Sequence, residues 1–589
     1  MNTETMPVLR EHQAGSRTDL LSPVPSRRLG LSLLAGAMAL GAALRFYNLG
    51  WGAPFFHFHI DEHFVFVGAD LLRRDPHEAA MSPKFFMYSP GPMYAVNVLR
   101  SAFEWFSGPL DLTNPQDQVT YMVMGRAISA ALGTLTIPLV YWIASTVGGR
   151  LAGVIAAVLL ATSVIHLRES HFFTVDISLT FFSILTLAFL ARVVTRGDLT
   201  GQVGAGIAFG LAVLSKYTAL FLIPIIGLAF LLSPNGPRAV RPVAAWLRQG
   251  FGAAVALAIG AATFLLLDPL VLRYYDKFRS DVREWVTDPL LGDWKPLWVG
   301  QFAGVEPYTY WFTNLLWWGL GPAFEIVALA GLLWLLMRRN RLAFLLGAFC
   351  VAYWLLAGRT VAPFIRYAVP LAPALAIAAG TVCAAALTRP RWRGLARAGT
   401  AALLVTTGLW AGAYLNVFRQ PDSRLVASEW LHRHVAQDAA ILLEPHHNIP
   451  PTGTYLSSVN FHADYVMWGH RRERHDYYRF FTLDVYQWLY NRGPSDEERQ
   501  QYIDSRLALA DWILMDDTFL QQYANQPEEV HGVVKQYYRD LFAGRLGFEL
   551  VETFKVYPSL FGWTINDDAA ELTFRLFDHP RVFVFRRVS

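Results

Sequence analysis

Residues 123–147 read VMGRAISAALGTLTIPLVYWIASTV, a run of 25 residues with a single charged side chain, Arg126. An α-helix needs about 20 apolar residues to cross the hydrocarbon core of a membrane, so this run predicts a membrane span. The rest of the chain has the same character. Of its 589 residues 54% are hydrophobic and 16% are charged, whereas about a quarter are charged in soluble proteins. These values exclude a soluble enzyme and a disordered scaffold.

Further apolar runs predict a polytopic α-helical membrane protein with about eleven transmembrane helices. The predicted spans are 29–49, 123–147, 151–166, 176–195, 202–215, 217–233, 250–267, 315–337, 342–357, 364–387 and 398–417. Arginines gather before the first span and in every second connection: Arg27–Arg28, Arg150, Arg192–Arg196, Arg238–Arg248, Arg338–Arg341 and Arg389–Arg397. Since basic loops stay in the cytoplasm, we expect a cytoplasmic N-terminus and an extracytoplasmic C-terminal region.

Three regions between or after the spans are long enough to fold. The first outward loop, 50–121, has helical patterns at Glu62–Arg74 and Met93–Phe106, and the outward segment 268–314 is rich in Trp, Tyr and Pro. Residues 418–589 alternate helical and strand-like stretches, which predicts a soluble α/β domain. We therefore expect a cytoplasmic tail (1–28), a transmembrane domain that holds the active site (29–417) and an extracytoplasmic α/β domain (418–589).

Charge and cysteine content exclude two further classes of protein. The net charge of +4 is small for a chain of this length and argues against a nucleic-acid partner. The two cysteines, Cys350 and Cys383, both lie in apolar runs, so neither a disulfide framework nor a cysteine-based zinc site is expected.

An acidic pair, Asp61-Glu62, follows the first span in the segment HFHIDEH, residues 57–63. Ionisable groups near the hydrocarbon are costly, and so they indicate function. A carboxylate here could accept a proton from an incoming hydroxyl, an effect worth roughly 10²- to 10⁴-fold in rate. Two alternatives stay open: Asp61 as the N-cap of a surface helix, and a divalent-metal site of His57, His59, Asp61 and His63, which would share one face of an extended chain.

Several charged residues lie at the predicted outward ends of other spans. Asp176 opens the fourth span, and Lys216, one of only six lysines, lies between two apolar runs. Arg359 and Arg366 flank the ninth and tenth spans on the same side, against the positive-inside trend. A helix-dipole acid and a snorkelling lysine are the structural alternatives, but three outward cations indicate a phosphate at the membrane surface. Four neighbours are candidate substrate contacts: Lys84, Tyr88, Arg168 and His171.

These residues together resemble the membrane-embedded GT-C glycosyltransferases, in the branch of protein O-mannosyltransferases and bacterial aminoarabinose transferases, glycosyltransferase family 39. The resemblance covers about residues 27–390. It rests on Asp61-Glu62 after the first span, Asp176 in HFFTVD, Lys216 in LSKYT, and the segment RYAVPLAP from Arg366. Many relatives have His-Pro-Pro or Glu-Lys-Pro where this chain has Tyr88-Ser89-Pro90, so a charged side chain is absent there, and Lys84 is the nearest substitute.

The resemblance implies transfer of a sugar from a polyprenyl-monophosphate donor to an acceptor hydroxyl, with inversion. The hypothesis that it favours is a glycosyltransferase at the outer face of a prokaryotic plasma (cell inner) membrane. It implies that Asp61 is the general base, that Asp176 helps to position it or the acceptor, and that Lys216 and Arg366 contact the donor phosphate. The acceptor is a glycan, a lipid or a protein, and membrane lipid is the other partner. No cofactor is required by this scheme.

Two other functions stay open on the sequence. One is a transporter of lipid-linked glycans without chemistry, against which the lack of an internal repeat counts. The other is a metal-dependent hydrolase or phosphotransferase that uses the histidines near Asp61. In the C-terminal domain, Asp516-Asp517 and Asp567-Asp568 are candidates for a glycan or Ca²⁺ site, although acids in turns are the simpler explanation.

Overall fold

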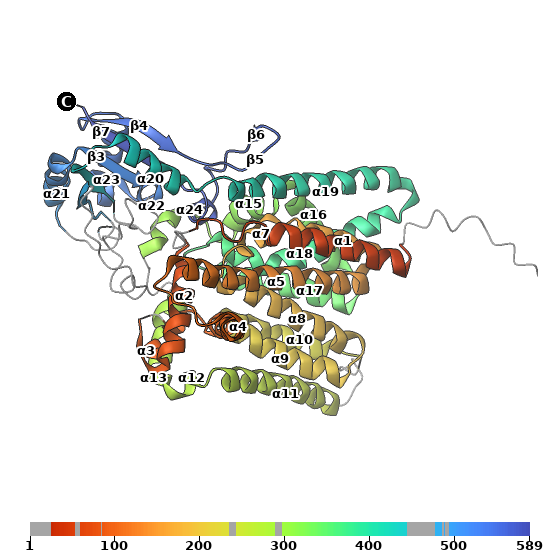
Figure 1. Ribbon diagram of the computed structural model, residues 1–589. Helices are drawn as coiled ribbons and strands as arrows, with labels where there is room; N and C mark the ends of the chain where they lie inside the picture. Colours follow the sequence, from red (N-terminus) through yellow and green to blue (C-terminus); the bar gives the residue numbers. More distant parts are fainter. Residues whose placement is uncertain are drawn as a thin grey trace, which may run out of the picture.

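The computed structural model describes residues 25–53, 59–83, 85–234, 243–288, 297–444, 478–485, 488 and 494–588. Figure 1 shows a bundle of helices that run side by side, with a mixed α/β region at one end. The bundle contains α1 (Arg27–Arg45), α5 (Pro115–Gly148), α6 (Arg150–Ala161), α8 (Val175–Thr195), α9 (Leu199–Ser215), α10 (Leu222–Leu231), α11 (Val243–Leu267), α16 (Pro322–Met337), α17 (Arg341–Ala357), α18 (Ala372–Leu387) and α19 (Arg393–Leu415). They occur where the apolar runs predict them, since a helix satisfies its own backbone polar groups in lipid.

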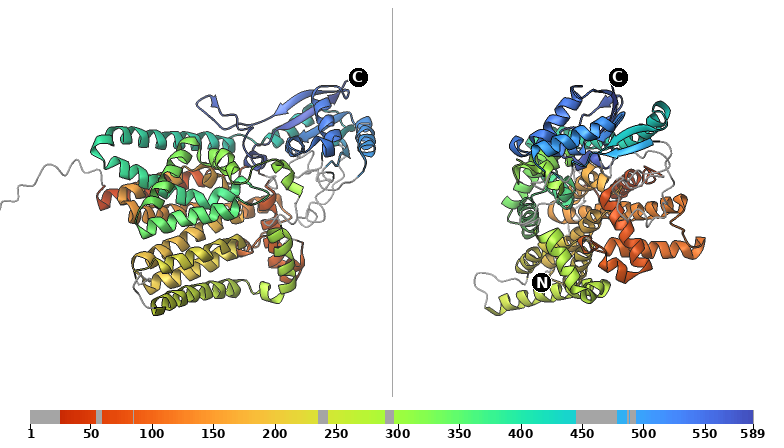
Figure 2. Two further views of the ribbon diagram at one scale, coloured as in Figure 1. Left: turned by 180° about the vertical axis from the view of Figure 1, so that it is seen from behind. Right: turned by 90° about the vertical axis from the view of Figure 1, so that its left-hand side faces the viewer.

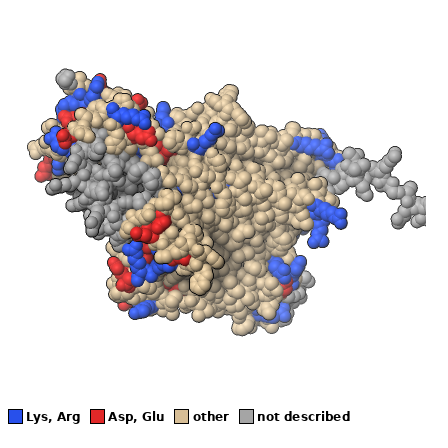
Figure 3. Space-filling model, in the orientation of Figure 1, with Lys and Arg blue, Asp and Glu red and all other residues tan. Residues whose placement is uncertain are grey.

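The bundle has the surface of a membrane protein. Among the described residues, six helices are long and apolar enough to cross a membrane, and one bent pair is a seventh candidate. Shorter apolar helices occupy Arg150–Ala161, Leu199–Ser215, Tyr217–Leu231 and Arg341–Ala357. Figure 3 shows charged side chains gathered at both ends of the bundle, with a broad uncharged band between them. The polytopic helical membrane fold is confirmed, while the number of eleven spans stays a prediction.

The predicted span 315–337 is broken in the structure. The helices Trp311–Leu320 and Pro322–Met337 meet at an angle of 117°. Gly321 between them has φ of 87°, a left-handed conformation that glycine adopts without steric cost, and Pro322 begins α16, where its missing N–H is not needed. The expectation of one continuous span is therefore wrong here, because Gly-Pro ends one helix and starts the next inside a continuous apolar run.

Further helices lie around the same end of the bundle as the α/β region. They are α2 (Ile60–Arg74), α3 (Pro76–Met81), η2 (Phe85–Met87), α4 (Gly91–Ser107), α7 (Val164–Glu169), η3 (Tyr217–Phe221), α12 (Leu270–Arg273), α13 (Tyr275–Val282), η4 (Arg283–Thr287), η5 (Leu297–Phe302), η6 (Trp311–Leu315), α15 (Leu316–Leu320), η7 (Ile365–Leu371) and η9 (Asn416–Arg419); η8 (Pro390–Trp392) precedes α19. Figure 2 shows α/β elements over one part of this end, while α2, α3, α12 and α13 of Figure 1 occupy the other part. The two helices expected in the first outward loop are thus present as α2 and α4.

The α/β region holds a five-stranded sheet with the order β2-β1-β3-β7-β4. Its strands are β1 (Ala439–Leu443), β2 (Tyr478–Thr482), β3 (Trp512–Asp516), β4 (Phe548–Phe554) and β7 (Val582–Arg587), with a hairpin of β5 (Ser559–Leu560) and β6 (Trp563–Thr564). β1 runs parallel to β2 and β3, whereas β7 runs antiparallel to β3 and β4. The helices are α20 (Ser423–His434), α21 (Asp496–Leu509), α22 (Thr518–Ala524), α23 (Glu528–Phe542) and α24 (Thr573–Leu576). The expected C-terminal α/β fold is confirmed.

Buried polar contacts tie the α/β region to the bundle. Arg168 in α7 donates to the Asp578 carboxylate at 3.0 Å, and the Tyr414 hydroxyl in α19 donates to the same carboxylate at 2.6 Å. His579 lies between Asp578 and Asp567, with its Nε2 2.8 Å from the latter. Burial lowers the pKa of His579, but the two carboxylates outweigh burial and raise it to about 9. At neutral pH this histidine is therefore charged and part of an ion network at the junction.

The other C-terminal acids also take part in internal contacts. Asp517 is buried and pairs with Arg575 and, at 2.8 Å, with Arg581. Asp568 pairs with Arg581 at 3.2 Å, and Asp516 accepts a backbone N–H at 2.7 Å. These contacts support the interpretation of the four acids as turn and ion-pair residues of the domain.

Candidate functional site

Asp61 lies in the first turn of α2 and has two side-chain neighbours. Its Oδ1 accepts a hydrogen bond from the Tyr88 hydroxyl at 2.7 Å, and its Oδ2 pairs with the Arg366 guanidinium, also at 2.7 Å. Arg366 is in η7, the turn that leads into α18. Three of the predicted site residues, which lie far apart along the chain, therefore meet at one point.

A second ion pair lies beside the first. Lys216 caps the end of α9, where the backbone becomes extended, and its Nζ donates to Asp176 Oδ1 in the first turn of α8 at 2.7 Å. The Lys216 Nζ is 4.9 Å from the centroid of the Tyr367 ring, and the Arg366 Cζ is 5.7 Å from the same centroid. One aromatic ring thus contacts both cations. We call the following residues the paired-ion cluster: Asp61, Tyr88, Asp176, Lys216, Arg366 and Tyr367.

The paired-ion cluster is partly open on its basic side. The side chains of Lys216 and Arg366 are 21% and 13% exposed, whereas those of Asp176 and Asp61 are 3% and 9% exposed. Burial raises the pKa of the Asp61 carboxyl, but opposing effects, of which the charge of Arg366 is the largest, outweigh burial and bring the pKa below its usual value. Asp61 is therefore ionised at neutral pH, which is the form that accepts a proton.

Glu62, the second acid of the predicted pair, has different partners. Arg126 donates to both of its carboxylate oxygens at 2.9 and 2.8 Å, and the backbone N–H of Phe173 donates at 2.8 Å. Arg126 also donates to the carbonyls of Leu49 and Trp51. Because Glu62 is fully buried in this network, it holds α2 against α5, and the geometry gives no support to its predicted catalytic role.

Arg168 and His171 lie outside the paired-ion cluster as well. Arg168 is engaged by Asp578 and by Glu169 at the junction with the α/β region. The His171 ring stacks on the Phe418 ring with centroids 4.3 Å apart, and burial lowers its pKa to about 4, so it is neutral. The geometry gives no support to substrate contacts from either residue.

The histidines near Asp61 do not line an extended strand. From Ile60 onward the backbone is helical, so Asp61 and His63 do not share one face of an extended chain with His59, as the metal hypothesis requires. That expectation is wrong because the acidic first turn of α2 favours a helix. Within the described ranges no three His, Cys, Asp or Glu side chains are placed to hold an ion, and His57 lies outside those ranges.

Two other predicted contacts are not part of the cluster. Arg359 is exposed in the turn after α17, and its guanidinium forms no ion pair with any residue that the structure describes. Lys84 lies outside the described residues. The predicted phosphate contact of Arg359 therefore has no support from geometry, unlike those of Lys216 and Arg366.

Tyr353 and Glu571 hold η7 in position, and the sequence revealed neither of them. The Tyr353 hydroxyl in α17 donates to the Tyr367 carbonyl at 2.6 Å. Glu571, just before α24, accepts the backbone N–H of Ile365 at 3.0 Å, next to Arg366, and it is 2% exposed. The signal for Glu571 is one acid within the otherwise apolar segment AAELTF, and nothing in the sequence shows which distant element it contacts.

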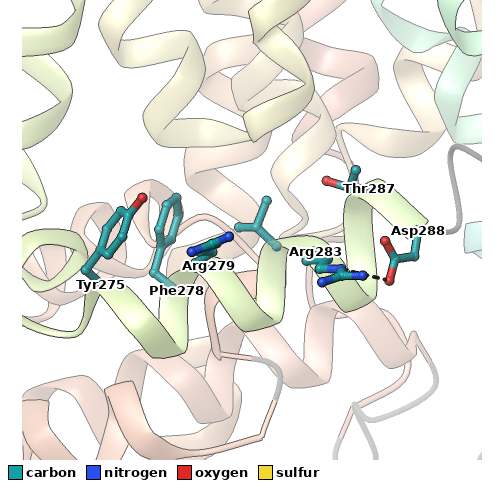
Figure 4. A pocket seen from close by; sticks show the side chains of 7 residues that line it. Tyr275, Phe278, Arg279, Arg283, Thr287 and Asp288 are labelled. Carbon is teal, nitrogen blue, oxygen red and sulfur yellow. Dashed lines mark ion pairs between the residues drawn. The ribbon is translucent and has the colours of Figure 1, made fainter.

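A hollow of about 440 Å³ lies along α13 and η4. Figure 4 shows Tyr275, Phe278 and Arg279 beside it on α13, and the ion pair of Arg283 with Asp288 at 3.7 Å. The Phe278 ring packs edge-on against the ring of Tyr217, with centroids 5.5 Å apart. Tyr217 directly follows Lys216 of the paired-ion cluster. Phe278 therefore lies between the hollow on one side and the chain neighbour of Lys216 on the other.

The middle of the chain matches a known family. The model of the dolichyl-phosphate-mannose-protein mannosyltransferase family matches residues 121–262, a stretch that contains Asp176 and Lys216. No curated protein sequence matches the chain.

Similarity to solved structures extends over most of the chain. The oligosaccharyltransferase of Archaeoglobus fulgidus in the apo form has a TM-score of 0.51 and 14% identity, over 93% of this chain and 76% of that chain. Its complex tethered with an acceptor peptide gives a TM-score of 0.50 and 14% identity over 93% and 75%. ArnT from Cupriavidus metallidurans in the apo state gives 0.47 and 15% over 84% and 94%. At this level of identity the archaeal enzyme shows a shared fold, and residue roles must come from the geometry above.

Proposed function

We propose that this chain, a membrane protein with the fold of the GT-C glycosyltransferases, transfers a sugar from a polyprenyl-monophosphate donor to an acceptor hydroxyl at the outer face of the membrane. The observation on which this rests most is the paired-ion cluster: two cations and two carboxylates around one tyrosine ring. The match of residues 121–262 to a family that is named for a dolichyl-phosphate sugar donor supports the same donor class.

The two cations suit a donor phosphate. Lys216 and Arg366 both lie within 6 Å of the Tyr367 ring centroid and are more exposed than the two carboxylates with which they pair. A guanidinium binds phosphate through a planar fork and an ammonium binds it as a point charge. Asp176 holds Lys216 at 2.7 Å and so positions that ammonium.

Asp61 is the proposed general base. When the donor phosphate engages Arg366, the Asp61 carboxylate loses part of its ion pair and becomes free to accept the acceptor's hydroxyl proton. The acceptor oxygen then forms a bond to C1 of the sugar as the bond from C1 to the phosphate oxygen breaks, with inversion at C1. The released polyprenyl phosphate keeps the electron pair, and its negative charge is stabilised by Lys216 and Arg366.

The proposed orientation puts the cluster outside a plasma membrane and the N-terminus in the cytoplasm. Figure 3 supports it: basic side chains dominate the end of the bundle where α1 begins, whereas acidic and basic side chains mix at the end with the α/β region. Cytoplasmic ends of membrane proteins have this basic excess.

The test is sugar transfer by the purified protein in liposomes. Mass spectrometry of lipids and glycans that change when the protein is deleted from its host identifies the substrates. Asp61→Asn is expected to stay folded and to lose about 100-fold or more of kcat, because it removes the base. Glu78→Gln, an exposed acid in the same outer loop, is the matched control. Turnover of Asp61→Asn close to that of the unmodified protein would refute the base assignment.

Two further readouts separate the alternatives. A chelator leaves a base-driven transferase active and stops a metal-dependent hydrolase. Movement of a labelled lipid-linked sugar across the liposome, without a new glycosidic bond, would identify a transporter instead.

A further inference from the structure

Four polar side chains meet beside the paired-ion cluster, where α9 and α11 end and α4 begins. Asp268 follows α11, and its Oδ1 accepts a hydrogen bond from the Tyr94 hydroxyl in the first turn of α4 at 3.1 Å. Tyr217, at the start of η3, lies next to Ser89 and within electrostatic reach of Asp268 and Tyr94. We call Ser89, Tyr94, Tyr217 and Asp268 the Asp268 cluster.

Three polar atoms of the Asp268 cluster are buried with hydrogen-bonding capacity that the described residues do not use. Asp268, Ser89 and Tyr217 are 0%, 1% and 7% exposed. Asp268 Oδ2 has no hydrogen bond to any residue that the structure describes, and the Ser89 and Tyr217 hydroxyls, which lie next to each other, have no further partner among those residues. Proteins pair nearly all buried polar groups, because an unpaired one costs the free energy of its lost solvation. Three such atoms in one place therefore indicate a polar ligand.

Two residues of the Asp268 cluster adjoin the proposed reaction centre along the chain. Ser89 follows Tyr88, which bonds Asp61, and Tyr217 follows Lys216, which pairs with Asp176. A close backbone approach fixes this arrangement: a Cβ on Gly91 would lie 2.6 Å from the carbonyl oxygen of Leu214 at the end of α9. A ligand of the Asp268 cluster would thus lie beside residues whose chain neighbours, Tyr88 and Lys216, belong to the paired-ion cluster.

We propose that the Asp268 cluster binds ring hydroxyls of the donor sugar. Asp268 Oδ2 accepts from one sugar hydroxyl, while the Ser89 and Tyr217 hydroxyls donate to or accept from its neighbours. This inference rests on the proposed function, which requires the sugar to lie between the donor phosphate and Asp61.

The chemistry of the cluster favours a neutral, hydroxyl-rich ligand. An ionised carboxylate repels a second phosphate, and hydroxyl donors are its suitable partners. Phe278, which packs on Tyr217, also lines the hollow along α13, so an aromatic surface adjoins the cluster. Sites built to pair substrate hydroxyls discriminate strongly against sugars that lack them, because their own polar groups are then left unpaired.

The experiment compares the affinity of the purified full-length protein for undecaprenyl phosphate and for undecaprenyl-phosphate mannose, glucose and arabinose. The readout is a ratio: the dissociation constant for undecaprenyl phosphate divided by that for the sugar-bearing lipid that binds best. Asp268→Asn is expected to lower this ratio about tenfold or more, and Tyr217→Phe about fivefold, with the affinity for undecaprenyl phosphate unchanged. Glu325→Gln is the matched control, since this buried acid in α16 also has an unpartnered oxygen.

Tyr217→Phe separates binding from folding. The variant removes an oxygen whose one polar neighbour among the described residues is the Ser89 hydroxyl, so its melting temperature is expected to stay close to that of the unmodified protein while sugar binding weakens. An unchanged ratio in both variants would overturn the inference. An unchanged ratio with a raised KM for the acceptor would overturn the donor assignment and identify the acceptor's sugar as the ligand.

The two proposals fail in different ways. Sugar-dependent binding that Asp268→Asn abolishes, in a protein that transfers no sugar, would refute the proposed function and leave the subsite in place. Transfer that needs Asp61, with the ratio unchanged in the variants, would refute the subsite alone.

Discussion

Arg366 has two effects in the paired-ion cluster. It supplies positive charge beside Lys216, and it pairs with Asp61 at 2.7 Å and thereby keeps that carboxylate ionised despite its burial. The cation that binds the leaving group and the cation that prepares the base are therefore the same residue. Loss of this guanidinium should therefore weaken binding of the donor and raise the pKa of the base.

The first prediction compares Arg366 with Arg359, since the sequence indicates both as outward cations for a phosphate. Arg366→Gln should raise the KM for the donor about tenfold or more, because charge-assisted bonds to phosphate are strong. Arg359→Gln should leave both kcat and KM within about twofold, because Arg359 is exposed and outside the cluster. Steady-state kinetics with the polyprenyl-phosphate donor measure both, and equal losses in the two variants would contradict the placement.

The second prediction concerns pH. Asp61 must be deprotonated to act as base, and its lowered pKa puts the acidic limb of kcat/KM below the usual range of an aspartate. Without Arg366, burial dominates and raises the pKa, so in Arg366→Gln activity should be lost at higher pH as the solution is acidified. A pH profile of kcat/KM checks this, and an acidic limb at the same pH in both proteins would argue against Asp61 as the base.

Which site residues the sequence reveals depends on their surroundings. Asp61, Asp176, Lys216 and Arg366 were predictable because a charge at the edge of an apolar run is costly and therefore conspicuous. Tyr367 was quoted only as part of a motif, since one more aromatic residue among 24 tyrosines has no distinctive pattern. The same reasoning gave Glu62, Arg168 and His171, whose charge and polarity are instead explained by buried structural partners.

At the level of elements, α4 and α9 are joined by an approach that only glycine permits. Gly91 faces the Leu214 carbonyl so closely that a Cβ would lie 2.6 Å from its oxygen. Backbone atoms cannot move aside as a flexible side chain can. This contact keeps Tyr88 and Ser89 beside Lys216 and Tyr217.

The third prediction follows from that contact. Gly91→Ala should push α4 away from α9, lower the melting temperature by several degrees and reduce transfer about tenfold or more, since misplacement by 1 Å costs up to 100-fold. Gly36→Ala in α1, where a Cβ meets nothing within 4 Å, should change neither. Thermal unfolding and turnover of both variants provide the measurement, and normal activity in Gly91→Ala would show that the close approach is not needed.

The sequence predicts where helices and strands occur better than it predicts where a helix is interrupted. The apolar runs located the helices of the bundle, and short strand-like stretches located most strands of the sheet. The bend at Gly321 was missed because the residues on both sides are apolar, so hydropathy shows one run where the backbone makes two helices.

For the whole molecule, buried polar contacts join the α/β region to the bundle. Arg168 and Asp578 form a buried pair across the junction, and Glu571 accepts the N–H of Ile365 beside Arg366. The region that sequence analysis set apart as a separate domain thus contributes directly to the position of η7. Sequence could not show this, because contacts between distant segments leave no local pattern.

The fourth prediction tests that coupling. Glu571→Ala should lower kcat about tenfold or more while the protein stays in the membrane, because η7 loses a fixed hydrogen bond, and Glu571→Gln, which keeps an acceptor oxygen, should retain most activity. Glu549→Gln, an exposed acid on β4, is the control in the same region. Equal activity of the Ala variant and the unmodified protein would show that the α/β region does not position Arg366.

The central claim is that Lys216 and Arg366 bind the phosphate of a polyprenyl donor within reach of Asp61. An experimental structure of the protein with bound undecaprenyl phosphate tests it most directly. We expect phosphate oxygens about 3 Å from the Lys216 Nζ and from the Arg366 guanidinium, with the lipid running between helices of the bundle. A phosphate bound at the opposite end of the bundle, or beside Arg359 and out of reach of both cations, would contradict the account.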